Sequence, residues 1–205
     1  LSVIICYRKD LWELIRHPFQ RYVLLIIIAS VPAGIAGVVF GDFFAALFEN
    51  IWVPAIALLF TASLLFIADR FRGDLQGKDM TWWMALLIGV MQMIAICPGI
   101  SRSGATIFMA LLIGISRTEA AKFSFIMSIP VILGSFLLET ASVIKDTGTF
   151  AIEPVFLVAA TVAAVSGVLA IKLVVNLLNE GRLRYFAYYC TIFAMTTILF
   201  LSLGM

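Results

Sequence analysis

Residues 82–116 read WWMALLIGVMQMIAICPGISRSGATIFMALLIGIS, and this stretch decides the fold. It is uncharged for 20 residues before Arg102 and for 14 residues after it. A helix needs roughly 20 apolar residues to cross the ~30 Å hydrocarbon core of a bilayer, and 14 helical residues reach only about 21 Å. We therefore predict a re-entrant helical hairpin over 82–116, which breaks near Pro98 and Gly99 and returns to the side it entered.

The whole chain has the composition of an integral membrane protein. Of its 205 residues 63% are hydrophobic and 13% are charged, and the mean hydropathy is +1.11. A soluble domain is about 25% charged. This composition excludes a soluble enzyme, a nucleic-acid-binding protein and a disordered chain. The net charge of +2 indicates no acidic partner.

Five further apolar stretches approach the length of a membrane span. They cover residues 22–41, 51–68, 123–138, 154–171 and 185–205. Every Trp and Tyr lies at or near a segment end, as in the aromatic belts of membrane proteins. We predict an all-α polytopic membrane protein, one integral membrane domain over 1–205, with about five full spans plus the hairpin. Residues 1–6 are too short to span, and we expect them to end a helix that begins upstream.

Lys and Arg set the expected orientation, because cytoplasmic loops are enriched in them. The basic loops are 8–21, 69–81, 116–122 and 177–184. The loop 42–50 contains Asp42 and Glu49 but no Lys or Arg, and the loop 144–153 has a single Lys. We predict that the basic loops face the cytoplasm and that the other two loops and the C-terminus face outward.

The break in the hairpin has the residues of an anion-binding site. Gly99 permits a sharp turn or the close approach of a ligand. Ser101, Ser103 and Thr106 place three hydroxyls at the start of the next helix, where free N–H groups and the helix dipole favour an anion. Arg102 adds a planar fork of donors suited to phosphate or carboxylate, and an arginine at membrane depth is costly unless it functions.

A purely structural role for these residues stays open. Ser and Thr could simply cap a helix while Arg102 pairs with a buried carboxylate. Glu139 is the candidate partner nearest in depth, although we expect it at the outer surface. His17, the one histidine of the chain, lies beside Pro18 in a basic loop and is read as an ordinary interfacial residue.

The run PGISRSGAT at 98–106 resembles the second signature of the undecaprenyl-diphosphate phosphatase, or bacitracin-resistance, family. Gln92 in GVMQMIAICPG precedes it, SRTEAAKFSFIMSIP follows it, and the likeness extends along essentially the whole chain. The resemblance implies a membrane hydrolase that removes the terminal phosphate from undecaprenyl diphosphate, a polyprenyl diphosphate lipid, and so recycles the lipid carrier of peptidoglycan synthesis. It also implies inverted repeats and a multi-pass place in the bacterial plasma membrane, with the site open to the outer side.

The resemblance also assigns roles to the residues of the motif. As catalytic residues it implies Arg102, Ser101, Ser103 and Thr106, and as substrate-binding residues Gly99, Arg102 and Gly104. The family's first signature, a Glu-rich stretch ending in a Ser-Ser-Thr-Gly-His type sequence, brings a requirement for a divalent cation, Mg²⁺ or Ca²⁺. These 205 residues contain no such stretch and no metal ligands of that kind. We expect that stretch upstream of Leu1, and we expect this chain alone to hold half an active site and to be inactive.

The alternative function is a transporter or flippase for an anionic lipid or a small anion, since broken helices and inverted repeats also build transporters. A transporter usually carries several ionisable groups within the membrane, whereas only Arg102 qualifies here, which favours the enzyme. The expected partners are the membrane and its lipid substrate, with no nucleic acid, and a homo-oligomer is left open.

Overall fold

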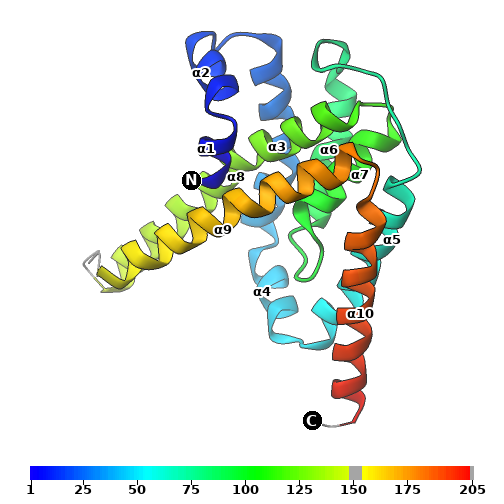
Figure 1. Cartoon of the computed structure of the whole chain (residues 1–205). Coiled ribbons are helices and arrows are strands. Elements are labelled where there is room, and N and C mark those ends of the chain that lie inside the picture. The colour runs from blue at the N-terminus through cyan, green and yellow to red at the C-terminus, as the bar shows by residue number, and fades with distance from the viewer. Residues whose placement is uncertain (148–153, 204–205) are drawn as a thin grey trace.

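The computed structural model describes residues 1–147 and 154–203, and the regular elements within these ranges are helices (Figure 1). In chain order they are α1 (Ser2–Cys6), α2 (Arg8–Arg16), α3 (Arg21–Val39), α4 (Gly41–Glu49), α5 (Trp52–Ala68), the short 3₁₀ turn η1 (Gly77–Asp79), α6 (Trp82–Ile94), α7 (Arg102–Leu112), α8 (Arg117–Thr147), α9 (Pro154–Asn179) and α10 (Leu183–Ser202).

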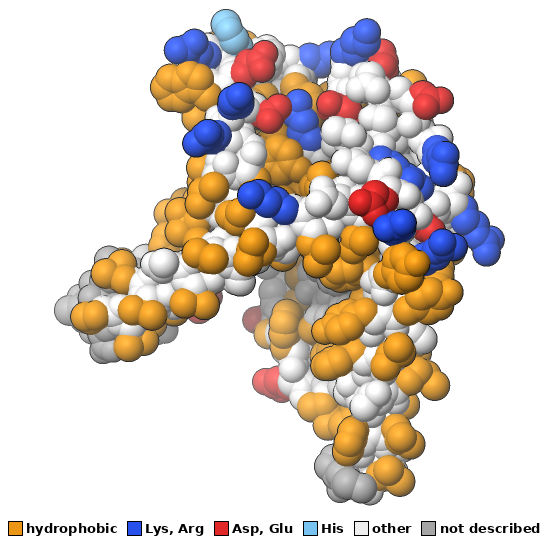
Figure 2. Space-filling model, viewed as in Figure 1, with side chains coloured by type: hydrophobic (Ala, Val, Ile, Leu, Met, Phe, Trp, Pro, Cys, Tyr) orange, Lys and Arg blue, Asp and Glu red, His pale blue; other side chains and the backbone are white. Residues whose placement is uncertain are grey.

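The helices that carry the predicted spans are α3, α5, α8, α9 and α10. Among the described residues, α3, α8, α9 and α10 are each long and apolar enough to cross a membrane. The fifth, α5, meets the same test only together with α4, from which it is bent by 100°. In Figure 2 the charged side chains gather at the upper end of the molecule, and hydrophobic side chains cover most of the rest. The prediction of an all-α polytopic membrane protein is confirmed.

Two segments predicted as loops are helical instead. Residues 42–49 form most of α4, which ends before Asn50, and residues 8–16 of the basic segment form α2. Both helices have only nine residues, which is too short to stand out as spans. Their charges are mixed with respect to the helix dipole. Asp42 and Asp10 lie in the first turns and Arg16 in the last turn of α2, which is favourable, whereas Arg8 and Lys9 begin α2 and Glu49 ends α4.

The spans pack in a few close pairs. Helix α10 runs along α5, α6 packs on α3, and α7 contacts both α5 and α8. Helices α8 and α9 form a long hairpin that projects to the lower left in Figure 1. Only 6% of the 18-residue apolar stretch by which α9 could cross the membrane is buried within the protein. This suits a helix whose remaining surface contacts lipid.

Small residues let two of these pairs approach closely. A Cβ added at Gly89 of α6 would overlap the backbone of Ala29 in α3, so only glycine allows this contact. A Cβ added at Gly167 of α9 would overlap the hydroxyl of Ser2 in α1. That hydroxyl donates to the carbonyl of Ala164 in α9 at 3.1 Å. The small residues of α9 therefore serve packing within the chain at this point.

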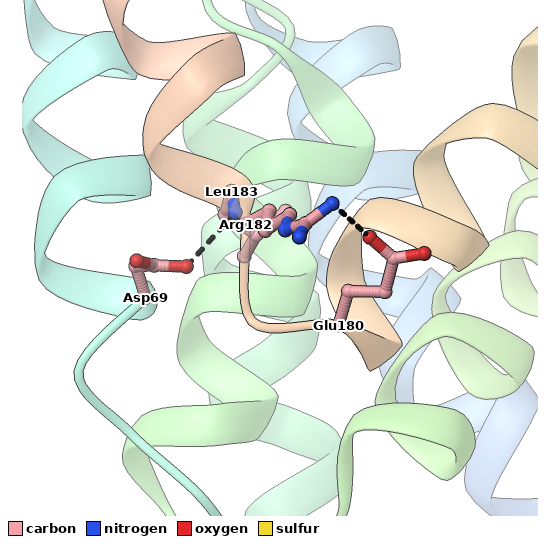
Figure 3. Close-up of polar contacts among 4 residues, drawn as sticks. All are labelled: Asp69, Glu180, Arg182 and Leu183. Atoms are coloured by element: carbon pink, nitrogen blue, oxygen red, sulfur yellow. Dashed lines mark hydrogen bonds and ion pairs between the residues drawn. The ribbon is translucent and has the colours of Figure 1, made fainter.

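Asp69 fixes the start of α10. Its Oδ1 accepts a hydrogen bond from the backbone N–H of Leu183 at 2.8 Å (Figure 3). The Nη2 of Arg117 donates to the carbonyl of Asp69 at 3.0 Å. Because Asp69 directly follows α5, these bonds join the ends of α5, α8 and α10 on one side of the molecule.

We expect Asp69→Ala to lower the free energy of unfolding by about 1 kcal/mol, because α10 loses an acidic partner at its N-terminus. For a chain of this size that is a fall of roughly 2–4 °C in the melting temperature. The matched control is Glu180→Ala. Glu180 pairs with Arg182 at 2.8 Å, but the two side chains are 53% and 58% exposed, and such pairs contribute little (Figure 3). Equal melting temperatures of the two variants in detergent would contradict this role of Asp69.

Candidate anion-binding site at the hairpin

Helices α6 and α7 form the predicted hairpin. They contain 13 and 11 residues and so rise only about 20 and 17 Å, less than the ~30 Å core of a bilayer. The backbone N–H of Leu75 donates to the carbonyl of Gly114 at 3.0 Å, and the N–H of Ser116 donates to the carbonyl of Leu75 at 2.9 Å. These bonds hold the segment before α6 beside the turn after α7. The hairpin therefore begins and ends on the same side of the molecule.

Thr61 of α5 holds the tip of the hairpin. Its hydroxyl donates to the carbonyl of Gly99 at 3.1 Å and accepts from the N–H of Ser101 at 3.0 Å. Gly99 has a φ of +91°, a conformation that favours glycine. The side chain of Thr61 is only 1% exposed. One buried hydroxyl thus pairs two backbone groups of an irregular segment that would be costly to leave unpaired in apolar surroundings.

The start of α7 keeps donors free for an anion. Ser101 caps the helix, since its Oγ accepts from the N–H of Gly104 at 3.1 Å. Within the described ranges, the N–H groups of Arg102 and Ser103 have no acceptor. The guanidinium of Arg102, which is partly buried, forms no ion pair or hydrogen bond with any described residue. The start of α7 therefore has two free amides and the positive end of a helix, and Arg102, whose guanidinium is unpaired, is the first residue of that helix.

The hydroxyls of the motif lie in different places. Thr106 is 1% exposed; its Oγ1 donates to the carbonyl of Arg102 at 2.9 Å and shares a hydrogen bond with the hydroxyl of Ser124 in α8. Ser101 and Ser103 instead line a cavity of about 30 Å³ against α9 and α10. That volume has room for about one water molecule. The structure thus places Ser101 and Ser103 beside a cavity that Arg102 does not line, and it places Thr106 between α7 and α8.

Two other candidate residues lie outside this arrangement. Glu139 lines a groove between α3 and α8, and it forms no ion pair with Arg102. Glu139 therefore does not form the structural pair with Arg102 that the sequence left open. His17 follows α2 directly and is exposed.

Sequence reasoning missed two partners of the hairpin, Thr61 and Ser124. A lone hydroxyl in an apolar helix usually bonds to a carbonyl of its own helix, so neither residue stood out. A usable signal is the alanine four residues before each of them, Ala57 and Ala120, which leaves room for a second helix to approach. Gln92 of α6 is a further buried polar residue: it is 1% exposed, and within the described ranges neither atom of its amide has a partner.

The described residues offer no ligand set for the divalent cation that the resemblance implies. Among the side chains of residues 1–145 and 154–203, no three His, Cys, Asp or Glu converge closely enough to hold a metal ion. No step proposed below is assigned to a metal ion.

We expect Thr61→Val to lower the free energy of unfolding by about 1–3 kcal/mol, because it leaves two buried backbone groups of the tip unpaired at nearly constant volume. The melting temperature in detergent should fall by several degrees. Ser63→Ala is the matched control on the same helix, since the hydroxyl of Ser63 is exposed and bonds only to the carbonyl of Leu59 at 2.9 Å. A Thr61→Val protein as stable as this control would show that the tip is held by other contacts.

This fold and this site define a class: polytopic α-helical membrane proteins with a helical hairpin whose second helix begins at an unpaired arginine and has free amides. The chain belongs to the family described as bacitracin resistance protein BacA, whose family model matches residues 1–196. The resemblance first seen in the motif is thereby confirmed over nearly the whole chain.

Curated relatives of the family carry a common name. An undecaprenyl-diphosphatase of Oceanobacillus iheyensis is 35% identical over 216 aligned residues, which cover 98% of this chain and 78% of that protein. Undecaprenyl-diphosphatases of Methanosphaera stadtmanae and Alkaliphilus metalliredigens are 39% and 38% identical, over 91% of this chain and 67% and 68% of theirs.

Proposed function

We propose that this chain, together with the first signature that the family resemblance implies, forms an enzyme that hydrolyses undecaprenyl diphosphate to undecaprenyl phosphate and inorganic phosphate. The observation that carries the proposal is the unpaired guanidinium of Arg102 beside two free amides at the start of α7, in a chain of this family. The overall reaction consumes one water: its oxygen becomes bonded to the terminal phosphorus, the bond from that phosphorus to the bridging oxygen breaks, and the lipid monophosphate keeps the bridging oxygen.

The residues of the hairpin bind and orient the diphosphate in this proposal. The guanidinium of Arg102 forms two parallel hydrogen bonds to phosphate oxygens, and the amides of Arg102 and Ser103 donate to a third. The hydroxyl of Ser103 has no partner among the described residues, but Ser103 lines the small cavity against α9 and α10, so no contact with the phosphate is assigned to it. Ser101 acts indirectly by capping α7, and Thr106 by fixing α7 against α8. Donors aimed at the phosphoryl oxygens stabilise the charge that develops as the anhydride bond breaks.

We further propose that the protein lies in the bacterial plasma membrane with this site open to the outer side, where it recycles the lipid carrier of peptidoglycan synthesis. The basic segments support this orientation. The tip of the hairpin supports it too, because Gly99 lies against Pro54 near the start of α5, whereas Asp69 at the other end of α5 joins the basic segment before α10.

Phosphate release tests the proposed function. The intact protein, meaning this chain with the first signature included, is given undecaprenyl diphosphate in detergent with and without Mg²⁺ or Ca²⁺, and both inorganic phosphate and lipid monophosphate are measured. We expect equal amounts of the two products from the intact protein, and the same assay measures the dependence on a divalent cation that the resemblance implies. The 205 residues alone are measured beside the intact protein and are expected to release no phosphate. Movement of the intact lipid diphosphate between leaflets of a vesicle, with no phosphate released, would instead favour the transporter or flippase.

Cysteine labelling tests the orientation. In a variant without Cys6, Cys97 and Cys190, a single cysteine is placed at Asp74 or at Glu49, both of which are exposed. We expect an impermeant maleimide added to intact cells to label position 49 at once and position 74 only after the membrane is opened. Rapid labelling of position 74 in intact cells would reverse the proposed topology.

A further inference from the structure

Helix α2 carries its basic residues on one outward face. Successive helical residues are 100° apart, so Arg8, Trp12 and Arg16 form one stripe and Lys9 lies beside it. All four side chains are exposed, and that of Trp12 is 57% exposed. The guanidinium of Arg16 lies 5.1 Å from the centre of the Trp12 ring. The stripe is therefore a compact basic surface around one aromatic ring.

The opposite face of α2 is bound to the rest of the protein. Lys122 of α8 pairs with Asp10 at 2.7 Å and lies 3.9 Å from Glu119. Leu11 and Leu14 pack against the main hydrophobic core. The inward face thus carries Asp10 and the leucines, and their contacts fix the rotation of α2 so that the basic stripe points away from the protein.

The cations of the stripe have no acidic partner among the described side chains. In residues 1–145 and 154–203, no carboxylate lies within ion-pair distance of Arg8, Lys9 or Arg16. The stripe also lies at the level of a membrane surface, because the span α3 begins at Arg21, shortly after α2 ends. A basic helix with an exposed aromatic residue at that level is typical of binding to anionic lipid.

We propose that this basic stripe, formed by Arg8, Lys9, Trp12 and Arg16, binds the headgroup of an anionic phospholipid in the adjoining leaflet. The two arginines, one turn to either side of Trp12, can each give parallel donors to a phosphate oxygen pair, and the indole ring can lie at the glycerol level. Charge complementarity favours phosphatidylglycerol over phosphatidylcholine, since each Lys or Arg near an anionic surface contributes about fivefold in affinity. This proposal is independent of the hydrolytic function.

Quenching of Trp12 by brominated lipids tests the proposal at the site itself. Trp52, Trp82 and Trp83 are replaced by Phe, and the full chain is reconstituted in phosphatidylcholine vesicles. Brominated phosphatidylglycerol or brominated phosphatidylcholine is then added at equal mole fractions. We expect phosphatidylglycerol to be enriched about fivefold or more around Trp12 at low salt, and the enrichment to shrink toward one at 1 M salt, where the Debye length is about 3 Å.

Two substituted proteins complete the test. The preference for phosphatidylglycerol should be lost in the triple variant Arg8→Gln, Lys9→Gln, Arg16→Gln. It should persist in the double variant Arg70→Gln, Arg72→Gln, which removes two exposed arginines elsewhere at the charged end. Equal quenching by the two lipids in the parent protein would overturn the proposal, as would the absence of quenching by either lipid. If the tryptophan replacements prevent folding, native mass spectrometry of the unsubstituted protein decides: phosphatidylglycerol must be retained over phosphatidylcholine, and the triple glutamine variant must lose this retention.

Discussion

Replacing Arg102 with Lys is expected to lower the rate of phosphate release from undecaprenyl diphosphate by roughly a thousandfold, although the positive charge is kept. An ammonium is a single point charge and cannot form the two parallel hydrogen bonds of a guanidinium. Losing that geometry at a partly buried site should remove about 4 kcal/mol of transition-state stabilisation, which corresponds to about three powers of ten in rate. The measurement is kcat/KM of the purified intact protein for the lipid diphosphate.

The control for Arg102→Lys is Arg72→Lys, an exposed arginine in the segment before α6, which should leave the rate unchanged. Both variants should also keep the melting temperature of the parent, because Arg102 forms no ion pair or hydrogen bond with any described residue. Near-parental turnover by the Arg102→Lys protein would show that Arg102 supplies charge alone. A large fall in its melting temperature would show that the arginine is structural.

The hairpin was predictable from the sequence because its signal is local. Arg102 divides the apolar stretch into pieces of 20 and 14 residues, and the second piece cannot cross a bilayer whatever it packs against. The anion-binding character of the break was predictable for the same reason. A helix start next to an arginine presents donors without help from other elements, and the structure has Ser101 as the cap of α7.

The positions of the hydroxyls were not predictable, because partners from other helices decide them. Thr106 and Ser103 both lie in the first turns of α7, yet the hydroxyl of Thr106 bonds to Ser124 in α8 and that of Ser103 has no partner among the described residues. Likewise, Thr61 of α5 holds the tip through bonds to residues 38 and 40 positions further along the chain, and Ala57 before it indicates only that a second helix can approach. The sequence did not predict that α4 is helical, because a nine-residue segment with an acidic residue near each end has the same pattern in a loop and in a short helix.

Gly99 is the position where a single methyl group should do the most damage. Its φ of +91° is a conformation that costs other residues about 1–2 kcal/mol. A Cβ there would also overlap the carbonyl of Pro54 and lie 2.6 Å from the Cα of Pro54 and 2.9 Å from the Cβ of Ala57. Relieving such an overlap in a packed interior costs a further ~1–3 kcal/mol. We expect Gly99→Ala to lower the free energy of unfolding by about 3 kcal/mol and the melting temperature by roughly 6–12 °C.

The same substitution should reduce phosphate release at least a hundredfold, because relief of the overlap moves the start of α7 away from α5, and a shift of about 1 Å at a reacting centre has effects of that size. Gly134→Ala is the matched control. Gly134 lies within α8, and a Cβ there would have no atom within 4 Å, so alanine should be neutral or stabilise the helix by up to about 1 kcal/mol. If both alanine variants melt and turn over alike, the contact of Gly99 with α5 does not position the site, and the donors of α7 must be held by Thr61 and Ser124 alone.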